Sequence, residues 1–296
     1  MTDMPAYGRR RTRRASGTLT AFAMVAALAA CATVPDQDRA RTTEASAPHE
    51  RRCQDVPRTG VSDARSGEFE SGSPLLVVSW NIHKNARPGW DRDLARFLAA
   101  GGLVLLQESL LEPAMRVTLD AARARWVQAE AWSAPLGPTG ALVAAPIAPI
   151  DYCVLREPEP AGVPPKSSVV AWFRIAGRSD TLAVASVHSV NFSPALAGYR
   201  RQLEALARTL AAHRGPIVVG GDFNTWSPVR AASLDEILGR IGLAAVVPDR
   251  DGRSRFLGLP ADHLYIRGMT PIESGVARVD SSDHAPIVAA LVFTAP

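Results

Sequence analysis

Short apolar runs recur along the chain from residue 75 onward, and most are bounded by Gly, Pro, Asn or Asp. Runs of this length and composition predict buried strands. We expect strands at residues 75–80, 103–107, 168–175, 181–187, 263–266 and 286–292, another beginning at Ile217, and short strands with turns between 126 and 155. Longer segments with Leu and aromatic residues at helical spacing predict amphipathic helices at residues 91–100 and 194–213, and we also expect helices at 112–125 and 229–240.

The order of these elements mixes a hairpin, at residues 168–187, with units in which a helix joins two strands. A doubly wound parallel sheet would alternate strand and helix throughout. The pattern therefore predicts an α+β fold of the α/β sandwich type, formed by one domain at residues 74–296.

The segment from Ile217 to Asn224 shows this pattern most clearly. An apolar run ends in two glycines, and an acid and an amide follow two residues apart. We expect a buried strand that enters a tight loop, with the glycines permitting the sharp turn. Asp222 and Asn224 then project into one cleft, where a carboxylate and an amide can bind a hydrated metal ion or orient a water molecule against a phosphate.

Polar residues that can do chemistry stand at the edges of six predicted strands. They are Asn81, Glu108, His188, Asp222 with Asn224, Asp262, and Asp283 with His284. One such residue is usually a solvated loop side chain, but six strand edges that supply acids, amides and histidines indicate a site built on a rigid scaffold. His263 follows Asp262 within a strand, so its side chain should point to the opposite face, away from the site.

The sequence around these residues resembles the endonuclease/exonuclease/phosphatase superfamily, which has the deoxyribonuclease-I-like fold. The resemblance covers residues 75–293 and rests on motifs in the family's order: Trp80-Asn81, Gln107-Glu108, Val187-His188, Gly221-Asp222-Phe223-Asn224, Asp262-His263-Leu264-Tyr265-Ile266 and Ser282-Asp283-His284. The neighbouring Asn-Ile-His-Lys-Asn and Leu-Leu-Gln-Glu resemble an uncharacterised bacterial branch, which does not identify a substrate. The resemblance implies a four-layer sandwich of two face-to-face mixed sheets with helices outside.

The resemblance also implies a metal-dependent phosphoesterase, and the chemistry of phosphate esters agrees with the residue types. Hydrolysis requires neutralisation of charge, an in-line water and a stabilised leaving oxygen. Glu108 is expected to be the main Mg²⁺ ligand, because a hard cation prefers oxygen donors, and Asn81 and Asp283 would join it directly or through water. Mn²⁺ is the alternative metal.

The remaining residues would act on the ester. Asp222 is expected to orient the attacking water, Asn224 to hold a phosphate oxygen and His188 to donate to a phosphate oxygen. Asp262 and His284 would form an acid–imidazole pair, in which the carboxylate fixes the tautomer and raises the basicity of the ring.

Two residues near these motifs have no assigned role. His83 lies two positions beyond Asn81, where some relatives place an acid near the metal, and Lys166 follows a Pro-rich loop and could touch a substrate phosphate. We expect both to face solvent. A zinc hydrolase is disfavoured, because the chain has no His-Glu-x-x-His run and no closely spaced Cys pair.

The basic charge of the chain is confined to its N-terminus. The 296 residues are 47% hydrophobic and 21% charged, which is ample for one large core. Five arginines and one aspartate within residues 1–30 account for the formal net charge of +4, so the remainder is neutral. The zero net charge of residues 31–296 argues against tight non-specific binding to duplex DNA, which requires several phosphate-neutralising cations.

The N-terminal segment has the order of a secretory signal. A basic run precedes an uncharged apolar stretch, Leu19 to Ala30, that is too short for a comfortable membrane span. Its end, Leu28-Ala29-Ala30-Cys31, resembles a bacterial lipoprotein signal in which Cys31 takes the lipid; a plain signal peptide or a short anchor is the alternative. We expect residues 1–30 to be the signal and 31–73 a flexible tether. The protein would be an exported lipoprotein at the periplasmic face of the outer membrane.

Export would place the two remaining cysteines, Cys53 and Cys153, in an oxidising compartment. They can form one disulfide that joins the tether to the domain, or they can remain separate buried thiols. Sequence does not show their proximity, so both arrangements stay open.

The function expected from the sequence is hydrolysis of phosphodiester bonds by a nuclease-like, membrane-tethered monomer. Its substrate would be a nucleic acid or a phospholipid head group. A lipid phosphodiesterase of the sphingomyelinase type, or a phosphomonoesterase, is the alternative within the same chemistry, although no paired aromatic hairpin for bilayer insertion is evident. A catalytically inactive binding lipoprotein on the same fold is the alternative from another class, and the intact residue set opposes it.

Overall fold

The structure is a computed structural model, and it describes residues 33–45, 47–54, 67–160 and 162–295. The expected signal peptide and Cys31, which we expect to take a lipid, lie outside the described residues. Within the described part of the chain, no helix is both long and apolar enough to cross a membrane.

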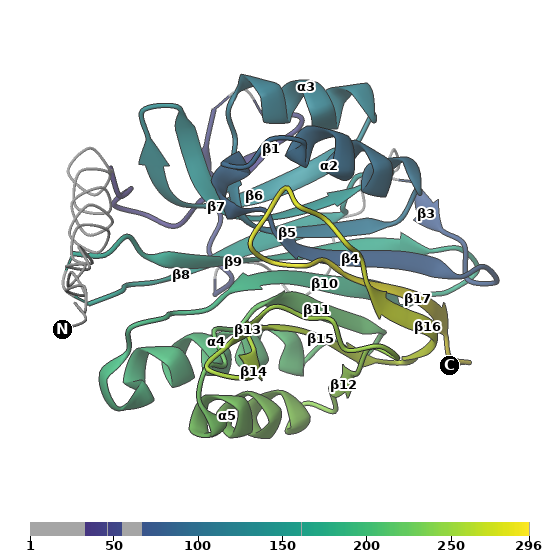
Figure 1. The fold of residues 1–296 in the computed structure, drawn as a ribbon. Coiled ribbons are helices and arrows are strands. Elements are labelled where there is room, and N and C mark those ends of the chain that lie inside the picture. The colour runs from purple at the N-terminus through teal and green to yellow at the C-terminus, as the bar shows by residue number, and fades with distance from the viewer. Residues whose placement is uncertain (1–32, 46, 55–66, 161, 296) are drawn as a thin grey trace, which may run out of the picture.

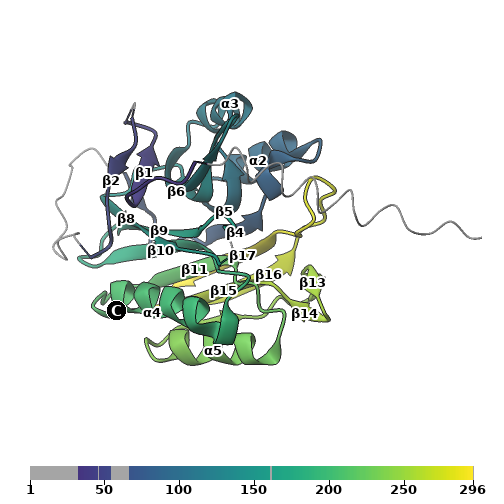
Figure 2. The same ribbon diagram turned by 90° about the vertical axis from the view of Figure 1, so that its left-hand side faces the viewer.

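Two β-sheets lie face to face, and a pair of α-helices covers the outer face of each sheet (Figure 1). A view from the side shows these layers in order (Figure 2). The helices on the first sheet are α2 (Trp90–Ala99) and α3 (Pro113–Ala121), and those on the second are α4 (Ala197–Ala211) and α5 (Pro228–Gly239). Two short 3₁₀ helices, η1 (His83–Asn85) and η2 (Pro194–Leu196), lie in loops. The expected four-layer α+β sandwich is confirmed.

The first sheet contains eight strands in the described part of the chain. Their order is β16 (Met269–Val276), β17 (Ile287–Phe293), β4 (Leu75–Asn81), β5 (Leu103–Leu110), β7 (Gly137–Ala145), β6 (Arg125–Ala134), β1 (Arg39–Thr42) and β2 (His49–Glu50). This sheet is mixed, because β4 pairs with β5 in parallel and with β17 in antiparallel orientation.

The second sheet is mixed as well, because β11 is parallel to β10 and antiparallel to β15. Its order is β12 (Ala244–Val246), β15 (Asp262–Arg267), β11 (Ile217–Asp222), β10 (Thr181–His188), β9 (Lys166–Ile175) and β3 (Glu68–Phe69), and β8 (Asp151–Glu157) also pairs with β9. A separate hairpin consists of β13 (Arg255–Phe256) and β14 (Leu259–Pro260).

Three apolar clusters fill the spaces between the layers. The central cluster lies between the sheets, and two others pack the helix pairs onto the outer faces. Strand β11 contributes to two of them, because side chains alternate across a strand. Val218 faces the central cluster, whereas Ile217 and Val219 face the helices. A strand buried on both faces explains the continuous apolar run in the sequence.

The described residues before position 74 include strands of the two sheets. β1 pairs antiparallel with β6 and buries Ala40 completely. A disulfide joins Cys53 to Cys153 of β8, which decides between the two arrangements left open by the sequence. We expected a flexible tether over 31–73 and a domain that begins at residue 74, and that boundary lies too far along the chain. β1 buries only alternate residues, so it has no apolar run to reveal it.

Candidate active site

The residues expected at strand edges converge at one end of the sandwich. β4 and β5 are parallel, as are β10 and β11, so each pair ends at one edge of its sheet. Asn81 at the end of β4 donates through Nδ2 to Oδ2 of Asp222 at the end of β11, at 3.0 Å. Further inside the sandwich, Nε2 of Gln107 in β5 donates to Oγ of Ser186 in β10 at 3.0 Å, which also joins the two sheets. The site therefore lies where the two sheets meet.

Gly220 and Gly221 lie within β11 and do not form the sharp turn that we expected of them. A β-carbon on Gly220 would lie 2.9 Å from Cδ1 of Leu105 on the opposite sheet, and one on Gly221 would lie 1.9 Å from the carbonyl oxygen of Val187. The backbone of Val187 excludes a carbon atom at Gly221, and at Gly220 the side chains of Leu105 and Ser79 would have to shift to make room for one. The glycines therefore allow β11 to approach its neighbours closely, which places the next residue, Asp222, against the first sheet.

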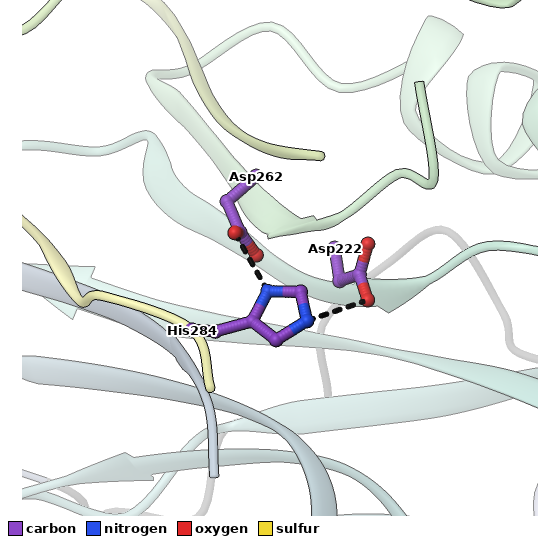
Figure 3. A group of neighbouring side chains, drawn as sticks. All are labelled: Asp222, Asp262 and His284. Atoms are coloured by element: carbon purple, nitrogen blue, oxygen red, sulfur yellow. Dashed lines mark hydrogen bonds and ion pairs between the residues drawn. The ribbon is translucent and has the colours of Figure 1, made fainter. Parts of the chain in front are cut away.

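A histidine lies between two aspartates at the centre of the site (Figure 3). Nδ1 of His284 lies 2.7 Å from Oδ2 of Asp262, and its Nε2 lies 3.8 Å from Oδ2 of Asp222. One ligand atom from each of the three side chains lies within 4.8 Å of the others, so they also form a candidate metal site. The structure thus brings together the acid–imidazole pair expected from the sequence.

Asp222 has contacts on several sides and is only 3% exposed. Its Oδ1 accepts from the backbone N–H of Asn224 at 3.0 Å, and its Oδ2 lies 3.5 Å from Nε2 of His188. Asn224 adopts a φ of 50°, and its Nδ2 donates to the carbonyl oxygen of Ser189 at 2.9 Å. An amide nitrogen carries two protons, so one remains for a ligand.

Glu108 lies on a β-bulge, where the register of β5 against β7 shifts and φ is 52°. Bulges re-aim side chains, and this one directs the carboxylate into the site. The carboxylate contacts the ammonium of Lys84, and its Oε1 lies 3.9 Å from Nζ of Lys166 and 3.8 Å from Nε2 of His188. Nζ of Lys166 also lies 3.0 Å from Nε2 of His188. Lys166 therefore belongs to the site, and our expectation that it faces solvent was wrong.

Asp283 lies at the rim of the site, with its side chain 44% exposed. Its Oδ1 lies 3.3 Å from Nδ1 of His83, and the backbone N–H of His83 donates to Oδ1 of Asn81 at 3.0 Å. Asp283 is thus linked to the rest of the site through His83 and Asn81. All the residues singled out as metal ligands or catalytic groups belong to one set that side-chain and backbone contacts connect.

The structure adds residues that support this set. Ser282, within the Ser-Asp-His motif, donates through Oγ to the carbonyl oxygen of Asn81 at 2.6 Å and accepts from the N–H of His284 at 3.1 Å. Arg230 of α5 is fully buried, and its Nε donates to the carbonyl oxygen of Asn224 at 2.6 Å. The motif is the signal for Ser282, whereas nothing in the sequence distinguishes Arg230 from an ordinary surface charge on a helix.

Burial and neighbouring charges set the protonation of the central group. Burial disfavours the charged ring of His284, but Asp262 and Asp222 outweigh it and raise its pKa to about 10. Burial raises the pKa of Asp262 to about 6, against the opposing charge of His284. Burial would also raise the pKa of Asp222, but the charge of His284 and the hydrogen bond from the backbone N–H of Asn224 hold it below its usual value. At neutral pH an imidazolium therefore lies between two carboxylates.

Around Glu108 the charges are reversed, because here one carboxylate lies beside two ammonium groups. Burial would raise the pKa of Glu108, but the ammonium groups of Lys84 and Lys166 hold it far below its usual range. Burial, and then the charge of Lys166, lower the pKa of His188 to about 3. A neutral His188 accepts through Nε2 from the ammonium of Lys166. In this arrangement the ammonium of Lys166 is a further hydrogen-bond donor beside His188, the residue that we expected to donate to a phosphate oxygen.

The donor set around Glu108 fits a hard divalent cation. Glu108 supplies an ionised carboxylate, and Asn81 supplies an amide oxygen that accepts one backbone hydrogen bond. The alternative set of Asp222, Asp262 and His284 fits less well, because Nδ1 of His284 and Oδ2 of Asp262 are already bonded to each other at 2.7 Å.

The chain is similar in sequence to a known protein family. The model of the Endonuclease/Exonuclease/phosphatase family matches residues 78–284. A UPF0294 protein of Vibrio campbellii is 34% identical over 260 residues, which cover 86% of this chain and 89% of that protein. A UPF0294 protein of Yersinia pseudotuberculosis is 37% identical over 215 residues, which cover 72% of this chain and 82% of that protein.

Solved structures share the fold at low sequence identity. The endonuclease/exonuclease/phosphatase from Beutenbergia cavernae superposes with a TM-score of 0.60 at 19% identity, covering 75% of this chain and 72% of that one. The human Nocturnin catalytic domain with bound sulfate superposes with a TM-score of 0.58 at 15% identity, covering 77% and 97%. From the family match and the UPF0294 relatives, we conclude that the chain belongs to the endonuclease/exonuclease/phosphatase family.

Proposed function

We propose that this protein is a Mg²⁺-dependent phosphoesterase that hydrolyses phosphodiester bonds. Membership of the family supports phosphoester hydrolysis. The observation that carries the proposal is the imidazolium of His284 between Asp262 and Asp222, on the side of Asp222 that also meets Asn81. Ionised acceptors for a water proton and cationic donors for phosphate oxygens thus lie within one site.

In this proposal the charge of each residue determines its role. Asp222, an ionised carboxylate with fixed partners, orients the attacking water and accepts its proton. His284 and Lys166 donate to phosphate oxygens as negative charge develops, and the free amide proton of Asn224 adds a neutral donor. A divalent metal held by Glu108, Asn81 and Asp283 would supply Lewis-acid stabilisation of that charge.

A substrate panel tests the proposal. The purified full chain is assayed with Mg²⁺ against plasmid DNA, RNA, sphingomyelin, bis-p-nitrophenyl phosphate and p-nitrophenyl phosphate. We expect turnover of diesters, its loss in Glu108→Ala/His284→Ala, and normal turnover in Asp120→Asn, which changes an exposed acid on α3. Absence of turnover with every ester, or equal turnover by the double variant, would refute the proposal. Cleavage of the monoester alone would reassign it as a phosphatase.

We also propose that the protein is exported and anchored by a lipid on Cys31. The basic and apolar N-terminal pattern supports export, and so does the disulfide between Cys53 and Cys153, because such bonds persist in oxidising compartments. In cells, Cys31→Ala should move the protein from the membrane fraction to the soluble fraction. Unchanged fractionation would contradict lipid anchoring.

A further inference from the structure

Both lysines of this chain contact one carboxylate. The sequence has 33 lysines and arginines, and only Lys84 and Lys166 are lysines. The ammonium of Lys84 meets Oε2 of Glu108, and that of Lys166 lies 3.9 Å from Oε1. A lysine presents a compact point charge, whereas the guanidinium of arginine is a broad planar group, so the two are not interchangeable at a crowded site. The chain thus uses its only ammonium side chains at the carboxylate that fits a metal.

The backbone around Lys84 is held in an unfavourable conformation. His83, Lys84 and Asn85 follow one another with φ values of 52°, 54° and 60°. Left-handed backbone is unfavourable for a non-glycine residue, and such strain persists where the surroundings enforce it. Here Asn85 is buried and donates through Nδ2 to the carbonyl oxygen of Leu110 at 2.7 Å. The anchored turn therefore fixes the α-carbon of Lys84 beside Glu108.

The side chain of Lys84 can nevertheless move. It is 41% exposed, whereas the side chain of Glu108 is 15% exposed and that of Lys166 is 19% exposed. Lys166 also has His188 as a partner at 3.0 Å. Of the two ammonium groups, that of Lys84 is therefore the one that can leave Glu108 by rotation of its own side chain, with the backbone unchanged.

We propose that Lys84 is a resident counter-ion of Glu108 that a divalent cation displaces. The inference rests on the proposed function, because it takes Glu108 as the metal ligand. Without metal, the ammonium neutralises the buried carboxylate. A metal and an ammonium at the same oxygen repel each other strongly at such short range. When the metal binds, Nζ of Lys84 therefore turns outward to the open side of the site, where it meets an incoming anionic phosphate.

Amine labelling of the wild-type full chain tests the displacement directly. Trace acetic anhydride followed by peptide mass spectrometry gives the acetylation rate at Lys84, measured against an added lysine peptide. We expect saturating Mg²⁺ or Mn²⁺ to raise this rate by about threefold to fivefold, the range expected when a half-exposed ion pair is broken. An unchanged or lower rate at saturation would overturn the inference.

Metal affinity gives an independent measurement. Lys84→Met removes the competing charge, so its Kd for Mn²⁺ by calorimetry should fall by about threefold to tenfold. Lys84→Arg keeps a positive charge and should not tighten binding. Arg116→Met, which removes an exposed cation on α3, is the control and should bind Mn²⁺ as the wild type does.

The outcomes separate this inference from the proposed function. If the wild type binds Mn²⁺, Glu108→Gln loses it, and neither Lys84 labelling nor the Lys84→Met affinity changes, the inference is wrong and the metal assignment stands. If the wild type binds no divalent metal, or Glu108→Gln retains full affinity, the metal assignment itself fails and the inference fails with it. The labelling experiment uses unmutated protein, so it remains decisive if a variant folds poorly.

Discussion

Nδ1 of His284 lies 2.7 Å from Oδ2 of Asp262, although the two residues come from different sheets. Asp262 begins β15 of the second sheet, and His284 lies in the loop before β17 of the first. The indole N–H of Trp80 donates to the carbonyl oxygen of His284 at 3.1 Å and holds that loop in place. The pair therefore exists only when both sheets are assembled, so its protonation is linked to folding.

This linkage predicts a pH-dependent stability in metal-free protein. The pKa of His284 rises from 6.5 to about 10 on folding. The folded state holds the proton more tightly, so the stabilisation is fully present below about pH 6.5 and is lost as the pH rises through about 10. In EDTA, thermal unfolding of the wild type should lose about 1 kcal/mol per pH unit in this window relative to His284→Asn. Parallel curves for the two proteins would contradict the linkage.

Metal binding should depend on Glu108 more than on Asp262. Glu108→Gln replaces an ionised ligand by a neutral amide and should weaken Mn²⁺ binding by more than about tenfold. Asp262→Asn should leave the affinity within about threefold, because that carboxylate is occupied by the His284 imidazolium. Calorimetry or Mn²⁺ resonance spectra measure both. The reverse order would place the metal at the group of Asp222, Asp262 and His284. EDTA should abolish turnover in either case.

The sequence predicted the fold where burial imposes a continuous apolar run. β11 is buried on both faces and was visible for that reason, whereas β1 buries alternate small and polar residues and was not. β16 was missed because it is an edge strand whose residues from Thr270 to Glu273 are exposed. The helix expected at 112–125 ends at Ala121, because Arg123 adopts a φ of 53° and the chain then enters β6.

The candidate site was predictable as a set of residues but not as a set of contacts. Asn81, Asp222 and His284 could be named because polar residues directly after apolar runs stand out. The position of Lys166 within the site could not be predicted, because only the packing of β9 beside β10 places its ammonium against His188. A role that depends on such neighbours, such as donation to a phosphate oxygen by Lys166 or His188, cannot be assigned from the sequence alone.

Lys166 should contribute to binding the charged phosphate. Removal of one preorganised donor from an active site typically lowers the rate by about 100-fold to 1,000-fold. Lys166→Met should therefore lower kcat/KM for bis-p-nitrophenyl phosphate by at least about tenfold, since a metal and His284 also stabilise the charge. Lys166→Arg should recover part of this loss. Steady-state kinetics near the wild-type values in Lys166→Met would show that the ammonium does not meet the substrate.

Arg230 is a buried cation that positions the loops on which the site depends. Its guanidinium carbon lies 3.9 Å from the ring centre of Tyr199 and 5.1 Å from that of Trp226. It donates to the carbonyl oxygens of Asn224 and Val190, which belong to the loops after β11 and β10. The guanidinium therefore connects the loop that carries Asn224 to the loop that follows β10, without contacting the reacting atoms.

Arg230→Met should lower both stability and kcat. Two buried carbonyl oxygens would lose their donor, at a cost of about 1–3 kcal/mol each, partly offset because the buried charge is also removed. Once the loops are no longer held, kcat should fall by about tenfold or more, whereas the Kd for Mn²⁺ should stay near the wild-type value because Glu108 lies on the other sheet. Kinetics are measured at a temperature where circular dichroism shows the variant folded.

Added guanidinium at low millimolar concentration should partly restore kcat in Arg230→Ala, where removal of the side chain leaves a space for it. A variant that is less stable but has full kcat would mean that Arg230 stabilises the fold without positioning Asn224.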